Sequence, residues 1–142
     1  MFGGGKVISA DRMVKLLDEA LIQQNDRIVH EGDSQKQSDS PAVQPARMDP
    51  NKLQGLNLCV SSVELPEHLD LFEKGLADNL HFSYAGPQSG RLARMTRDGS
   101  VKIGDGHTYV ALYSRYVTDL RADVARLVAI EADNDGTLYN RP

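Results

Sequence analysis

Cysteine is almost absent from this sequence, whose 142 residues include only Cys59. One thiol cannot form an internal disulfide, so the chain lacks the signature of a disulfide-stapled secreted protein. A zinc site built on paired cysteines is excluded in the same way. The histidines show no metal-ligand spacing either; they are His30, His68, His81 and His107. We therefore expect no metal and no cofactor.

Tryptophan and long apolar runs are also missing. No stretch approaches the roughly 18 apolar residues that cross a bilayer, and the first residues do not form a secretion signal. Hydrophobic residues make up 40% of the chain and charged residues 25%, as in ordinary globular proteins. These values predict a soluble cytoplasmic protein with no membrane association.

An excess of positive charge is the third thing lacking, because the formal net charge is −4. Nucleic-acid-binding domains usually need a basic face, since phosphate neutralisation supplies most of their affinity. The acidic balance makes nucleic acid an unlikely partner and favours another protein or a second copy of this chain, as in a homodimer.

Residues 9–30 are predicted to form an amphipathic helix, with Ser9 as its N-cap. Apolar residues recur at helical spacing along one side of this segment. The positions most suited to contact a partner are Met13, Leu16, Leu17 and Leu21.

Residues 32–52 change character, with no large apolar residue over 32–41 and prolines at 41, 45 and 50. Such a segment cannot bury enough surface to offset its ordering entropy. We expect three parts: the helix within 1–31, a flexible linker over 32–52, and a compact α+β domain over 53–142.

The compact part opens with a predicted strand over 56–63, where Leu56, Leu58 and Val60 alternate with polar residues. Pro66 suits the first turn of a following helix. A second strand is expected over 80–84, before Gly86 and Pro87.

Two short runs, 91–97 and 100–104, flank Asp98-Gly99, a favoured two-residue hairpin turn. Residues 107–113 are rich in β-branched and aromatic side chains. An antiparallel meander over 91–113 is therefore predicted, followed by a helix over 115–132. Tyrosines at 109, 113 and 116 leave open a helix that begins as early as Thr108.

The fold class predicted from these elements is α+β, a mostly antiparallel sheet covered by two helices, with the N-terminal helix tethered by the linker. Two short motifs add little. Gly3-Gly4-Gly5-Lys6 lacks most of a phosphate-binding loop, and the acidic run 131–138 lacks the closing glutamate of a calcium loop.

The leading functional hypothesis is a non-enzymatic interaction module, such as an adaptor, small chaperone or regulator, that docks its N-terminal helix in a groove. An alternative is a nucleic-acid-linked regulator that uses a basic hairpin over 91–102. Its contact residues would be Arg91, Arg94, Arg97 and Lys102. A second alternative is a small enzyme that uses Cys59 as a nucleophile. No catalytic residue is assigned, because no catalytic motif is present.

Overall fold

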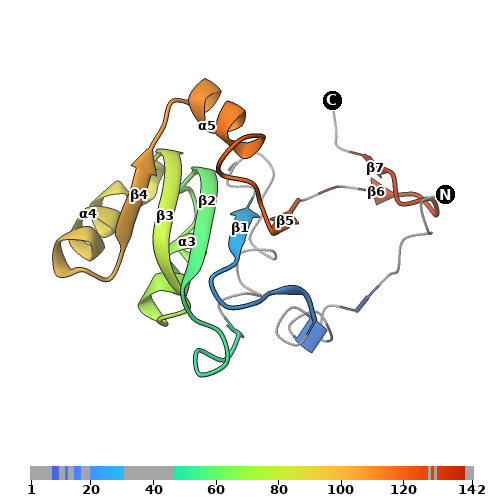
Figure 1. The fold of residues 1–142 in the computed structure, drawn as a ribbon, viewed down its shortest axis with the longest axis horizontal. Helices are drawn as coiled ribbons and strands as arrows, with labels where there is room; N and C mark the ends of the chain where they lie inside the picture. The colour runs from blue at the N-terminus through green and yellow to red at the C-terminus, as the bar shows by residue number, and fades with distance from the viewer. Residues whose placement is uncertain are drawn as a thin grey trace.

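The computed structural model describes residues 8–9, 12, 15–16, 20–30, 47–127, 129 and 131–139. Within these ranges, five strands form one parallel sheet in the order β4-β3-β2-β1-β5 (Figure 1). Its strands are β1 (Arg27–His30), β2 (Leu56–Ser62), β3 (Ala77–Tyr84), β4 (Lys102–Gly106) and β5 (Val124–Arg126). Helices α3 (Glu67–Glu73), α4 (Ser89–Asp98) and α5 (Tyr109–Tyr116), with the short 3-10 helix η4 (Gly86–Gln88), connect them.

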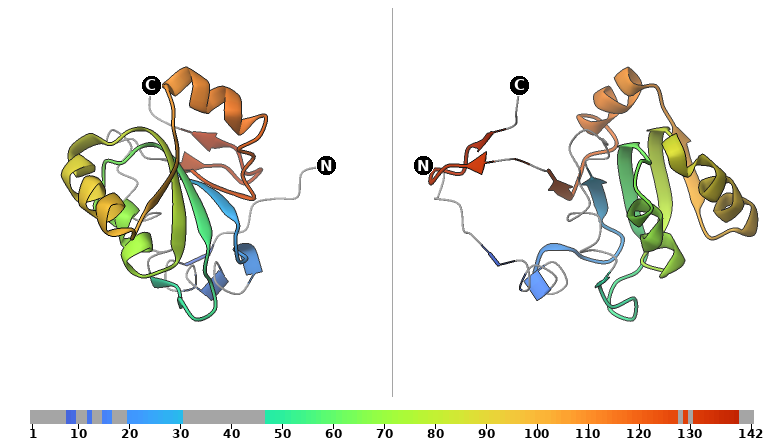
Figure 2. Two further views of the ribbon diagram at one scale, coloured as in Figure 1. Left: turned by 60° about the vertical axis from the view of Figure 1, so that its left-hand side comes forward. Right: turned by 180° about the vertical axis from the view of Figure 1, so that it is seen from behind.

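The main core lies between one face of the sheet and helices α3 and α4. Leu58 and Val60 of β2 point to this face, and they are buried in one cluster with Leu69 and Phe72 of α3. Leu92 of α4 joins the same cluster. The left view of Figure 2 shows α3 and α4 on one side of the sheet and α5 toward the other. This is a layered α/β arrangement, because each crossover between parallel strands needs a helix to cover the sheet.

The opposite face is covered by α5 near the carboxyl ends of the strands. Cys59 of β2 points to this face and is fully buried, as are Leu112 of α5 and Leu120 just after it. Thr108 caps α5 by accepting a hydrogen bond from the amide of Ala111 at 3.1 Å.

The antiparallel meander predicted over 91–113 is wrong, and so is the α+β class built on it. Residues 89–98 form α4, with Leu92 and Met95 buried three residues apart. Gly99 has φ 84° and ends this helix in the left-handed conformation. A helix C-terminus and a two-residue hairpin both require positive φ, so Asp-Gly alone does not separate them.

The segment after β4 forms α5, not a third strand of a meander. The helix begins after Thr108, as the alternative start allowed, and the predicted helix over 115–132 is wrong. It ends at Tyr116, and Val124–Arg126 form β5. The regularly spaced apolar residues that suggested one helix belong to a helix end, a turn and a strand.

The predicted helix over 9–30 is wrong at its end, because Arg27–His30 form β1 between β2 and β5. Asn25 has φ 67° and lies in the turn that starts the strand. Described residues 12, 15 and 16 are helical, whereas positions 32–46 of the predicted linker lie outside the described ranges. The strand expected over 56–63 and the helix expected after Pro66 are confirmed as β2 and α3.

A separate hairpin closes the described part of the chain, formed by β6 (Glu131–Ala132) and β7 (Leu138–Tyr139). The Asp133 carboxylate accepts hydrogen bonds from the amides of Asp135 and Thr137 and from the Tyr139 hydroxyl. The acidic run is thus a hairpin turn ordered by one carboxylate. Among the described helices, none is long and apolar enough to cross a membrane.

Candidate functional site

The strand order has one reversal, and it lies between β1 and β5. Strands β1 to β4 follow one another across the sheet, and then β5 returns to the other side of β1. In open parallel sheets, ligands bind outside the carboxyl ends of the strands at such a reversal. The carboxyl ends of β1 and β5 are therefore the first place to look for a site.

Three polar side chains are buried among the described residues, and all three lie at this edge. His30 ends β1 with 4% exposure, Ser62 ends β2 with 3%, and His68 lies in the first turn of α3 with 1%. Strand alternation places His30 and Ser62 on the face that α3 covers. Buried polar groups at an otherwise apolar edge mark a region with more than a packing role.

His30 and His68 contact each other edge to face, with ring centroids 5.2 Å apart and planes at 74°. Burial lowers the pKa of His68 to about 4, and nearby Glu64 opposes that shift. His68 is therefore neutral at neutral pH and carries one N–H donor and one acceptor nitrogen. Neither nitrogen has a hydrogen-bond partner in the described part of the structure.

The loops after β2 and β3 meet beside these histidines. The Ser62 hydroxyl donates to Glu64 Oε1 at 2.5 Å, and Gln88 Nε2 donates to the Glu64 carbonyl at 3.5 Å. Gly86 has φ 54°, and a Cβ there would lie 3.0 Å from the Val63 carbonyl. Only glycine fits both the conformation and the close approach, so Gly86 sets the spacing of the two loops.

Arg126 ends β5 and is the register partner of His30, so both side chains lie on the same face of the sheet. Its Nη1 atom is buried and has no hydrogen-bond partner among the described residues. Burial alone lowers the pKa of Arg126 to about 10. The group remains a cation at neutral pH, with no described carboxylate beside it.

We define the carboxyl-edge site as the group formed by these side chains: His30, Ser62, Glu64, His68 and Arg126. It combines a neutral imidazole donor, a hydroxyl–carboxylate pair and a cation. That combination suits a ligand with carbonyl and carboxylate oxygens. The described residues contain no group of three or more candidate metal ligands.

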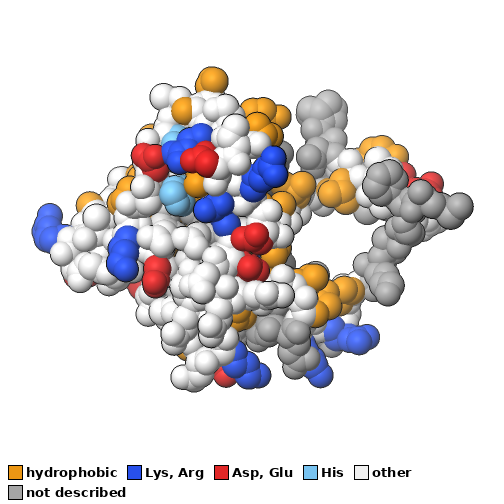
Figure 3. Space-filling view, in the orientation of Figure 1, with side chains coloured by type: hydrophobic (Ala, Val, Ile, Leu, Met, Phe, Trp, Pro, Cys, Tyr) orange, Lys and Arg blue, Asp and Glu red, His pale blue; other side chains and the backbone are white. Residues whose placement is uncertain are grey.

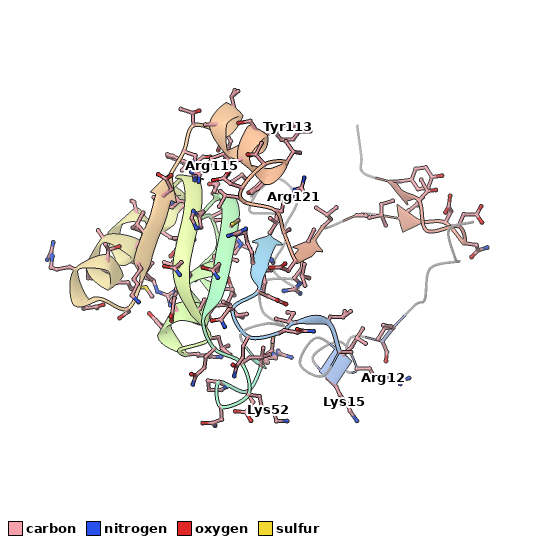
Figure 4. The ribbon with its side chains drawn as sticks, viewed as in Figure 1. Arg12, Lys15, Lys52, Tyr113, Arg115 and Arg121 are labelled. Atoms are coloured by element: carbon pink, nitrogen blue, oxygen red, sulfur yellow. The ribbon has the colours of Figure 1, made fainter. Side chains whose placement is uncertain are left out.

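A second polar group lies on the opposite face and fastens α5 to the sheet. Arg115 pairs with Asp105 and with Asp119, each at 2.5 Å, and Arg115 Nη1 lies 3.4 Å from His107 Nδ1. The rings of His107 and His81 stack with centroids 6.1 Å apart. Figure 3 shows this gathering of basic, acidic and histidine side chains below α5, and Figure 4 labels Arg115 within it. Because Arg115 is already paired with two carboxylates, we infer that this group holds α5 against the sheet.

The structure argues against Cys59 as the nucleophile of the enzyme alternative. Cys59 is fully buried, and burial raises the pKa of its thiol to about 11. A nucleophilic cysteine needs a lowered pKa and access to substrate, and Cys59 has neither.

The other candidate residues are spread over the structure. Arg91 pairs with Asp70 and Glu73, whereas three basic side chains are exposed on α4 and β4: Arg94, Arg97 and Lys102. They lie on a helix and an edge strand, not on a hairpin. Leu16 is half-buried and Leu21 is 48% exposed, while Met13 and Leu17 lie outside the described residues.

The family model described as "Malonate decarboxylase, alpha subunit, transporter" matches residues 1–142. The chain belongs to the malonate decarboxylase alpha subunit family. An acetyl-S-ACP:malonate ACP transferase from Malonomonas rubra is 42% identical over 139 residues, which are 98% of this chain and 25% of that protein.

Two solved structures of malonate decarboxylases agree with the fold. The alpha subunit from Acinetobacter baumannii has a TM-score of 0.91 and 42% identity over 98% of this chain and 26% of that one. A Pseudomonas malonate decarboxylase hetero-tetramer in complex with malonate has a TM-score of 0.91 and 45% identity over 98% of this chain and 25% of that one. The chain thus spans about a quarter of the length of these relatives.

Membership of this family overturns the leading hypothesis. The chain is related to an enzyme subunit, so the expectation of a non-enzymatic adaptor, chaperone or regulator is wrong. The nucleic-acid-linked alternative has no support among the relatives.

The carboxyl-edge residues were missed because their signals depend on the sheet. His30 and Arg126 are 96 positions apart in the sequence and become neighbours only through strand pairing. His68 was noted only as a histidine without metal spacing. Recognising helices between the strands would have predicted a parallel sheet, whose strand ends are the usual place for a site.

Proposed function

We propose that this chain forms part of an alpha subunit that transfers acyl carrier protein (ACP) from an acetyl group to malonate. The observation that carries the proposal is the 42% identity with the Malonomonas rubra transferase over 98% of this chain. The same alpha-subunit fold, with a TM-score of 0.91, gives additional support.

The reaction in that name exchanges one thioester for another. The C–S bond of acetyl-S-ACP breaks, a C–S bond to one malonate carbonyl carbon forms, and one malonate oxygen leaves with the acetyl group as acetate. No electron is gained or lost, and no proton is consumed overall. Such an exchange needs groups that bind carboxylates and stabilise oxygen atoms as they gain charge.

The carboxyl-edge site offers groups of that kind. His68 supplies a neutral N–H donor without a described partner, in a place where water is excluded. A buried donor interacts strongly with a developing negative charge, because the local dielectric is low. We place the acyl groups of the reaction at this edge.

The test is a chimera in which these 142 residues replace the matching quarter of the Malonomonas rubra transferase. Purified chimera is mixed with acetyl-S-ACP and malonate, and the mass of the carrier protein is followed. We expect malonyl-S-ACP to form when malonate is present and not to form when malonate is omitted. A folded chimera that makes none, under conditions where the parent does, would refute the proposal.

We further propose that the alpha subunit works with other protein subunits, as in the hetero-tetramer of the Pseudomonas relative. Exposed apolar side chains on α5 support a protein contact, with Val110 82% and Tyr113 76% exposed. Whether Leu16 and Leu21 also contact a partner stays a prediction. A V110D/Y113D double variant that still co-purifies with the other subunits at wild-type yield would argue against α5 as a contact.

A further inference from the structure

The Arg126 guanidinium is a partly buried cation for which the described residues provide no anion. Its Nη1 atom is shielded from solvent, and no described side chain accepts a hydrogen bond from it. An unpaired buried charge is costly, whereas the same charge paired with a carboxylate is stabilised by strong hydrogen bonds. The position is therefore suited to an anion that arrives with a ligand.

Other arginines near the sheet have hydrogen-bond partners within the fold. Arg115 pairs with Asp105 and Asp119, and Arg91 pairs with Asp70 and Glu73. Arg27 donates to the carbonyls of residues 119 and 121 at 3.0 and 3.1 Å. Arg91 and Arg115 are therefore balanced by carboxylates, and Arg27 binds two carbonyls through Nη1 although its Nε is buried without a partner. The buried Nη1 of Arg126 has neither kind of partner among the described residues.

The place of Arg126 in the fold also points to a ligand. Arg126 and His30 are register partners at the ends of β5 and β1, where the strand order reverses. His30 in turn contacts His68, so the guanidinium lies at the same edge as the imidazoles. Ligands of open parallel sheets bind at this point.

Malonate and acetate differ by one carboxylate. In the exchange described above, one carboxylate of malonate becomes the thioester carbonyl, and the other keeps its charge throughout. Acetate has no such second group. A cation at the second carboxylate lets an enzyme select malonate over acetate, and an arginine fork can bind that carboxylate through two hydrogen bonds.

We propose that Arg126 binds the carboxylate of malonate that does not react, and so makes the site selective for a dicarboxylate. The proposal rests on the proposed ACP transfer. Arg126 is then a specificity-determining residue, which contacts the substrate away from the atoms whose bonds change.

The test uses the alpha-subunit chimera carrying Arg126→Gln, with Arg126→Lys as a charge-conserving variant and Arg94→Gln as a control. Arg94 is an exposed arginine on α4 with no described ion pair. Two rates are measured for each protein: malonyl-S-ACP formation against malonate concentration, and exchange of labelled acetate into acetyl-S-ACP. The second reaction does not use the second carboxylate.

We expect Arg126→Gln to raise the KM for malonate by roughly 10- to 100-fold, the range for one or two charge-assisted hydrogen bonds. Acetate exchange should stay within about twofold of the wild type. Arg126→Lys should recover part of the malonate affinity, because it restores the charge but not the fork. Arg94→Gln should behave as the wild type in both assays.

Two results would overturn the proposal while ACP transfer itself stands. One is an unchanged KM for malonate in Arg126→Gln, and the other is an equal loss of malonate transfer and acetate exchange, which indicates a structural role. A wild-type chimera without transfer would instead refute the proposed function.

A binding measurement keeps the proposal testable if Arg126→Gln is inactive. Malonate should raise the melting temperature of the wild-type chimera and of Arg126→Lys, but not that of Arg126→Gln. Acetate should raise none of them. A malonate-dependent rise in Arg126→Gln equal to that of the wild type would contradict the assignment.

Discussion

His30 and Arg126 are neighbours at the ends of two adjacent parallel strands, although 96 positions separate them in the sequence. Their side chains share the face of the sheet on which His68 is buried. The pairing brings an imidazole and a guanidinium to the point where the strand order reverses.

The buried His68 should make stability depend on pH. Burial lowers its pKa to about 4 in the folded state, against 6.5 for an exposed imidazole. Between these values the unfolded chain binds more protons, so stability is lost as the pH falls from about 6.5 to about 4. The difference corresponds to about 3 kcal/mol at most. Denaturant unfolding at pH 7 and pH 4.5 should show a smaller loss of unfolding free energy in His68→Gln than in the wild type.

His107→Gln, on the other face of the sheet, is the control. Equal losses of unfolding free energy in all three proteins would contradict the prediction.

Gly86 should be sensitive to substitution for two reasons, and Gly75 for only one. Both have positive φ, 54° and 71°, but a Cβ at Gly86 would meet the Val63 carbonyl at 3.0 Å, while one at Gly75 meets nothing within 4 Å. Gly75→Ala should cost about 1 kcal/mol of unfolding free energy, and Gly86→Ala about 2 to 3 kcal/mol. Thermal and denaturant unfolding of the two variants measure these losses of unfolding free energy. Equal losses in Gly75→Ala and Gly86→Ala would contradict the prediction.

Cys59 should be dispensable for catalysis and slow to react. Its thiol is fully buried, and burial raises its pKa to about 11. A thiol reagent should label the native protein only slowly and the denatured protein at once. The Cys59→Ala variant should keep malonyl-S-ACP formation within about threefold, since the residue has a packing role. Rapid native labelling that abolishes transfer would restore a role for the thiol.

Arg115 should hold α5 against the sheet. It links Asp105 at the end of β4 to Asp119 after the helix. In Arg115→Met the amides of α5 should exchange with deuterium roughly two- to fivefold faster, a modest change because the pairs are partly exposed. Amides of β2 should be unaffected. If β2 and α5 change together, Arg115 supports the whole fold and not α5 alone.

The local elements with one dominant pattern could be predicted from the sequence. Alternation of Leu56, Leu58 and Val60 identified β2, and Pro66 identified the start of α3. Both are confirmed as the strand β2 and the helix α3.

The elements that were predicted wrongly have local patterns that fit both a helix and a strand or hairpin. Leu92 and Met95 fit a helix with one buried stripe, yet Asp98-Gly99 after them also suits a hairpin. Ile28 continues the apolar spacing of a helix, but with Val29 it favours a strand once β2 is available to pair. In both cases the pairing of distant segments selects the structure, and a local sequence pattern carries no information about that pairing.

The carboxyl-edge site was harder to predict than the helices and strands, because locating a site at the strand ends requires knowledge of the strand order. No local motif surrounds Arg126, and its burial depends on a strand of three residues. Parallel topology is the information that turns scattered polar residues into a candidate site.

The most direct test of the account is a crystal structure of the alpha-subunit chimera with malonate bound. One carboxylate of malonate should lie about 2.7–3.2 Å from the Arg126 guanidinium, with the other carboxylate near His68. Malonate bound away from the carboxyl ends of β1 and β5, with Arg126 paired to a carboxylate of the protein, would contradict it.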